Sequence, residues 1–71
     1  MPEEILAPVT GNVWRVLIEA GGVVSEGDEL IILESMKMEI PIEAPRAGTV
    51  TRLLVAEGVS VEEGDAVAEI E

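Results

Sequence analysis

Lys37 is the only lysine of this chain and therefore its only side-chain amine. Met36 and Met38 lie on either side of it, and Glu34 and Glu39 flank that triplet. Histidine, cysteine and tyrosine are absent from the sequence, which removes the usual general base, the thiol nucleophile and the commonest metal ligands. We therefore expect no catalytic residue and no metal site, and any chemistry that needs an amine must use Lys37.

The charge of the chain excludes several classes of partner. The formal net charge is −11 over 71 residues, and no basic patch opposes it. Phosphate backbones and anionic membrane surfaces would be repelled, so we expect no nucleic acid and no membrane partner. No apolar run approaches the ~20 residues that span a bilayer, and the acidic start does not resemble a signal peptide. A soluble, cytoplasmic protein is the expectation.

An internal repeat organises the sequence. Residues 7–34 align without a gap with residues 44–71, and twelve of the 28 aligned pairs are identical. One copy of about thirty residues cannot cover its own apolar face, whereas two copies packed together can. We therefore expect one domain, residues 1–71, whose two copies are related by a pseudo-twofold axis. That symmetry places the junction that contains Lys37 at the opposite end from the two termini.

The pattern of each copy predicts β structure. Segments 11–18 and 48–55 are rich in β-branched residues and begin at glycine, and 30–33 is a short apolar run. Turn signals follow at 26–28 and 63–65, and no segment shows a helical stripe. The expected fold is all-β: a flattened barrel or sandwich of two four-stranded antiparallel sheets, each built from both copies.

Strands 28–35 and 38–43 leave only Met36 and Lys37 for the turn between them. A tight turn prefers Asn-Gly, so Met-Lys departs from local preference, as functional sites often do. We expect Met36 and Met38 to be partly exposed recognition elements. Glu34 and Glu39 are either recognition residues or solvated strand ends.

The sequence also predicts the surroundings of three surface residues, Trp14, Arg15 and Arg52. Trp14 has a polar partner, Thr51, in the other copy, so we expect a half-exposed ring. Arg15 and Arg52 are equivalent in the two copies and are expected to bridge carboxylates.

The run Glu34 to Glu39, Glu-Ser-Met-Lys-Met-Glu, resembles the Glu-Ala-Met-Lys-Met signature of biotinyl domains. Segments 6–11 and 44–48 resemble the Ala-Pro entries of the two halves of that family, so the resemblance covers nearly the whole chain. Ser35 replaces the usual alanine, a small-for-small change. No insertion separates the early strands, so the chain is similar to the thumbless type of biotin carboxyl carrier protein or biotin/lipoyl attachment protein.

The resemblance implies a function and a set of partners. Biotin protein ligase would attach biotin covalently to Lys37. A biotin carboxylase would load a carboxyl group onto it, and the arm would deliver that group to a carboxyltransferase. The chain would be a non-catalytic carrier. The acceptor stays open among acetyl-CoA, as in fatty acid biosynthesis, propionyl-CoA, pyruvate and urea.

Two alternatives remain open. Lipoyl domains share the duplicated β architecture and modify a hairpin lysine, so lipoate, alone or in addition to biotin, is the alternative cofactor. Their usual signature is Asp-Lys-Ala, whereas this chain has Met-Lys-Met. An unmodified acidic interaction module is the other alternative, and it predicts that Lys37→Arg leaves function intact.

Overall fold

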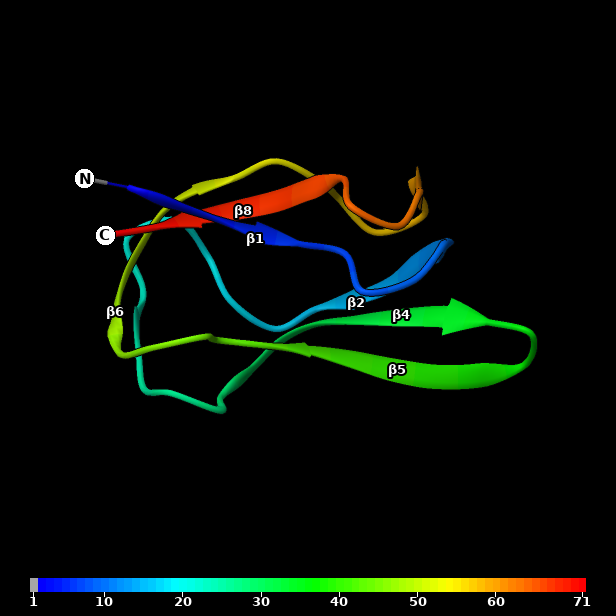
Figure 1. Ribbon diagram of the computed structural model, residues 1–71, viewed down its shortest axis with the longest axis horizontal. Helices are drawn as coiled ribbons and strands as arrows, with labels where there is room; N and C mark the ends of the chain where they lie inside the picture. The colour runs from blue at the N-terminus through cyan, green and yellow to red at the C-terminus, as the bar shows by residue number, and fades with distance from the viewer. Residues whose placement is uncertain (1) are drawn as a thin grey trace.

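The computed structural model describes residues 2–71 and consists of short β-strands. In chain order they are β1 (Glu3–Leu6), β2 (Gly11–Val16), β3 (Val23–Val24), β4 (Glu29–Ser35), β5 (Met38–Glu43), β6 (Gly48–Leu53), β7 (Ser60–Val61) and β8 (Ala66–Ile70). They form two four-stranded antiparallel sheets, in the orders β1-β8-β6-β3 and β5-β4-β2-β7 (Figure 1). The predicted fold class is confirmed. Within residues 2–71 the structure contains no helix long and apolar enough to cross a membrane.

An offset of 37 residues relates the two halves of the structure. It converts β1, β2, β3 and β4 into β5, β6, β7 and β8, and it converts the order of one sheet into the order of the other. Each sheet therefore takes two strands from each copy. The correspondence includes β1 and β5, which precede the aligned segments of the sequence.

The core between the sheets is entirely aliphatic. The largest fully buried side chains are Leu30, Ile31, Leu33, Ile70, Val13, Val50 and Val67. The neighbours Leu30 and Ile31 are both buried because the register of β4 shifts between Glu29 and Ile31. No polar or charged residue of the described chain is buried. Burial of this apolar surface stabilises the fold, and any polar chemistry must therefore take place at the surface.

Two predicted strands are shorter in the structure than in the prediction. The segments expected at 11–18 and 48–55 end as strands at Val16 and Leu53. The chain leaves each sheet there to reach the opposite sheet, where β3 and β7 begin. Ile18 and Val55 remain partly buried against the core during this crossing, which explains their apolar character.

The molecule is elongated, with principal extents of 32 × 17 × 17 Å. The N- and C-termini lie together at one end, and the turn between β4 and β5 lies at the other (Figure 1). This is the arrangement that the pseudo-twofold relation between the copies predicts. A group attached at the turn would therefore project away from any chain joined to the termini.

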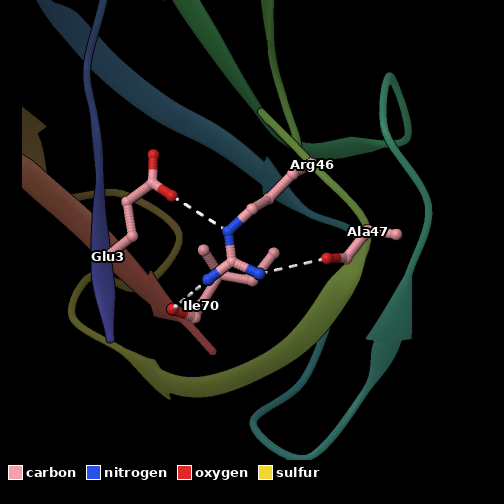
Figure 2. Close-up of polar contacts among 4 residues, drawn as sticks. All are labelled: Glu3, Arg46, Ala47 and Ile70. Carbon is pink, nitrogen blue, oxygen red and sulfur yellow. Dashed lines mark hydrogen bonds and ion pairs between the residues drawn. The ribbon is translucent and has the colours of Figure 1, made fainter. Parts of the chain in front are cut away.

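Arg46 joins several chain segments at the terminal end (Figure 2). Its Nε donates to Glu3 Oε1 at 3.0 Å, and its two terminal nitrogens donate to the carbonyl oxygens of Ala47 at 3.2 Å and Ile70 at 3.5 Å. The pair is solvent-exposed, so it contributes at most about 1 kcal/mol to stability.

The expectation that Arg15 and Arg52 bridge carboxylates is wrong. Among the described residues the ion pair joins Arg46 to Glu3. The Arg15 guanidinium lies over the ring of Trp14 instead, 5.0 Å from its centroid. An arginine stacked on an indole keeps its charge hydrated while covering apolar surface.

Gly11 and Gly48 allow neighbouring backbone segments to approach closely. A Cβ at Gly11 would lie 2.7 Å from the carbonyl oxygen of Glu34, and one at Gly48 would lie 2.6 Å from that of Glu71. Both obstacles are backbone atoms, so a methyl group forces the neighbouring strand to move. The two glycines are equivalent in the repeat, but only Gly11 lies beside the β4–β5 turn.

We predict that Gly11→Ala and Gly48→Ala each lower the free energy of unfolding by about 1–3 kcal/mol, as overpacking does. Only Gly11→Ala should also shift the backbone amide resonances of residues 34–38, because its methyl group displaces β4. Chemical denaturation and ¹H–¹⁵N spectra measure the two effects. Unchanged stability in both variants would contradict the close approach.

Candidate functional site

The β4–β5 hairpin ends in a two-residue turn. Ser35 and Met38 form the last cross-strand pair, which leaves Met36 and Lys37 as the turn residues. Their φ angles are 52° and 64°, so both lie in the left-handed region. Positive φ at both central positions is the pattern of a type I′ turn, whose twist matches that of the flanking strands.

The turn is held in place by the sheet behind it. Left-handed backbone costs an ordinary L-residue roughly 1–2 kcal/mol, and here two consecutive side-chain-bearing residues adopt it. The register that closes the turn also pairs Ile31 with Ile42 and Leu33 with Ile40. Ile31, Leu33 and Ile42 are buried, so a slip of one residue would expose them. Core burial therefore maintains the strained conformation that presents Lys37.

The side chains of the turn face solvent. Met36 is 93% exposed and Met38 is 63% exposed, and Lys37 is also exposed. The expected exposure of the two methionines is confirmed. Among the described residues, Lys37 forms no ion pair. The turn thus presents an accessible primary amine on a rigid support, and such an amine can be acylated by an enzyme that reaches it.

Two carboxylates face each other directly behind the turn. Glu34 and Glu39 are cross-strand partners, and both are exposed. Like charges in directly opposed positions destabilise an antiparallel pair. Within residues 2–71 neither carboxylate forms an ion pair with a cation. The hairpin therefore carries a locally unfavourable acidic pair next to the lysine.

Two further residues, Asn12 and Ser60, lie beside Glu34 on the same sheet. The sequence alone did not identify them as part of the site. Asn12 pairs with Glu34 from β2, and Ser60 pairs with Asn12 from β7. The Ser60 hydroxyl donates to Asn12 Oδ1 at 2.8 Å. Only the order of strands in the sheet brings these residues together, so no local sequence signal could have identified them.

A two-sheet β structure that presents one lysine on a tight turn is the arrangement of a biotin or lipoyl attachment domain. Residues 1–70 match the model of the Biotin_lipoyl family, described as biotin-requiring enzyme. The chain belongs to this family: it is a biotin carrier domain, with biotin as its cofactor.

Relatives and solved structures agree. The chain is 56% identical over 36 residues to the biotin/lipoyl attachment protein of Bacillus subtilis, over 51% of this chain and 49% of that protein. It is 46% identical over 44 residues to the biotinylated protein TB7.3 homolog of Mycolicibacterium smegmatis, over 62% of each. It superimposes on urea carboxylase of Kluyveromyces lactis with a TM-score of 0.94 and 37% identity, covering 100% of this chain and 6% of that one.

Met36→Asn should stabilise the hairpin by about 1 kcal/mol, because asparagine enters the left-handed region at low cost. Thermal and chemical unfolding measure the gain. Met38→Asn is the matched control: Met38 lies on β5 with an ordinary strand backbone, so no gain is expected there. Equal effects at the two positions would show that backbone conformation is not the cause.

Proposed function

We propose that this domain is a biotin carboxyl carrier, and that Lys37 is its attachment residue. The observation that carries the proposal is the exposed side chain of the only lysine, held in a two-residue turn at the far end of the molecule from the termini. Residues 1–71 act as one biotinyl domain in this proposal.

Biotin protein ligase acylates Lys37 in this proposal. An amide bond forms between Lys37 Nζ and the carboxyl carbon of biotin, the bond from that carbon to the adenylate breaks, and a base of the ligase takes the proton of the amine. The domain supplies no residue for this step. No His, Cys or Tyr exists in the chain, and no buried polar group is found among the described residues. The exposed methionines and the Glu34–Glu39 pair are the features that a ligase can recognise.

When attached, biotin supplies a nitrogen that can hold and release a carboxyl group. The task of the domain is to present that group to a biotin carboxylase and then to a carboxyltransferase. Because the turn lies opposite the termini, the whole 32 Å length of the domain extends the reach of the arm. Tethering keeps the group at high effective concentration near both enzymes. The likeness to a domain of urea carboxylase supports a carboxylase context without identifying the acceptor.

Lipoate is the second candidate cofactor. The observation that favours it is the 56% identity to a protein named as a biotin/lipoyl attachment protein. The same exposed amine in the same turn can be acylated by either ligase. We propose biotin as the main physiological cargo, because Met-Lys-Met matches the biotinyl signature.

Lys37→Arg should abolish biotinylation, because a guanidinium is not acylated by the ligase. Intact mass after incubation with biotin protein ligase, ATP and biotin measures the incorporation. A double variant, Lys37→Arg with Arg52→Lys, restores one lysine on the exposed face of β6 and should also remain unmodified. Incorporation into either variant would show that Lys37 in its turn is not the attachment site.

Incubation with biotin protein ligase and, separately, with lipoyl ligase should give faster incorporation of biotin than of lipoate. The time course of intact mass, at equal enzyme and domain concentrations, measures both rates. A faster lipoylation would assign the domain to lipoyl transfer. Absence of both modifications would favour the unmodified interaction module.

A further inference from the structure

The internal repeat allows each surface position to be compared with its equivalent in the other sheet. One row of residues crosses the outer face of the lysine-bearing sheet and has a matching row in the other sheet. The first row is Arg15–Ile32–Pro41 and its equivalent is Arg52–Glu69–Glu4. The strand pairing is the same in both rows, but the side chains of β4 and β5 are apolar whereas those of β8 and β1 are acidic.

Trp14 extends the apolar row. In β2 the register shifts between Val13 and Arg15, so Trp14 is an extra residue next to the pair of Arg15 and Ile32. The same irregularity in β6 places Thr51 at the position equivalent to Trp14. We call Trp14, Ile32 and Pro41 the apolar strip.

The fold does not require the apolar strip. Its equivalents Thr51, Glu69 and Glu4 occupy the same positions in the other sheet, which has the equivalent strand order. Trp14 is 42% exposed, although the Arg15 guanidinium covers part of its ring. Ile32 is partly exposed between Trp14 and the exposed Pro41. A partly exposed apolar stripe that is not repeated in the equivalent sheet is typical of an interaction surface.

The charges around the apolar strip define the chemistry of its partner. Glu34 opposes Glu39 on the side toward the turn, and Glu29 opposes Glu43 on the other side. None of these four exposed carboxylates forms an ion pair within the described chain. Both opposed pairs are unfavourable in the free domain. A surface with an apolar centre and lysine or arginine at its rim would complement the apolar strip and relieve the repulsion.

We propose that the apolar strip and its acidic rim dock the enzyme that carboxylates the attached biotin, an inference that rests on the proposed function. Ile32 lies three positions before Ser35, the last residue of β4, which is roughly 10 Å at 3.4 Å per residue. The ligase must bring its active site to Lys37 itself, at the turn. An enzyme that reacts at the end of the biotin-lengthened side chain stands farther from the turn. A contact with a second surface of the domain would hold such an enzyme in place, and the apolar strip with its acidic rim is suited to that contact.

The test replaces residues of the apolar strip by their repeat equivalents, Trp14→Thr together with Ile32→Glu. The biotinylated variant is offered to the purified biotin carboxylase component from the same host, with free biotin as the reference substrate of that enzyme. We expect KM for the domain to rise at least about tenfold with kcat nearly unchanged, as when a central interface residue is lost. Raising the ionic strength should increase KM for the unaltered domain, because rim charges are screened.

Two further variants serve as the control and as the replacement for the double variant. Val23→Glu makes an apolar-to-acidic change at an exposed position of the other sheet, 81% exposed, and should leave KM unchanged. Trp14→Ala alone serves if the double variant does not fold, and it should still raise KM.

The outcomes separate the two proposals. A wild-type domain that is not biotinylated overturns the proposed function. A wild-type domain that is biotinylated, with a KM unaffected by either change in the apolar strip, overturns the docking surface alone. Slower ligation of the variants with an unchanged KM would assign the apolar strip to the ligase and would also overturn the proposal.

Discussion

Two buried alanines connect the copies of the repeat, and the rest of the structure depends on that connection. The Ala7 amide donates to the Asp65 carbonyl at 2.8 Å, and the Ala7 carbonyl accepts from the Gly64 amide at 2.9 Å. The twin contacts around Ala44, with the Asp28 carbonyl and the Gly27 amide, have the same two lengths. Both alanines are 2% exposed, so no larger side chain fits there without displacing the core. Each copy thus satisfies the backbone of the other where it is shielded from water.

This reciprocal bonding joins the two copies of a 71-residue chain that has no cysteine to form a disulfide. Each sheet contains two strands from each copy, so neither sheet can form from one copy alone. The small aliphatic core is shared in the same way. Since the copies cannot separate without losing both sheets, the relative positions of the termini and the β4–β5 turn follow from the pseudo-twofold relation. A carrier needs this rigidity, because the flexible part should be the arm and not the domain that positions it.

The residues proposed to serve the function lie where the two copies of the repeat differ. The turn with Met36 and Lys37 has no counterpart, since the equivalent place is the gap between the two termini. On the outer faces, Trp14 and Ile32 replace Thr51 and Glu69 without any change in strand pairing. Both departures occur on the sheet that carries the lysine.

The sequence by itself determined the features that depend on residue type and chain order. A single lysine, a repeat at an offset of 37 and a two-residue gap between strands predicted the β class and the turn, and they made Lys37 the candidate attachment residue. The exposure of Met36, Met38 and Trp14 followed from their places at a turn and on a half-polar face.

Only the tertiary structure decided which strands are neighbours. Alternation along a strand tells which face a side chain occupies, but sheet order depends on pairing between distant segments. For this reason the positions of Asn12 and Ser60 beside Glu34 were not predicted. For the same reason the ion pair of Arg46 with Glu3 was not predicted, and Arg15 and Arg52 were expected to bridge carboxylates instead. The apolar strip likewise exists only because β2, β4 and β5 lie side by side in one register.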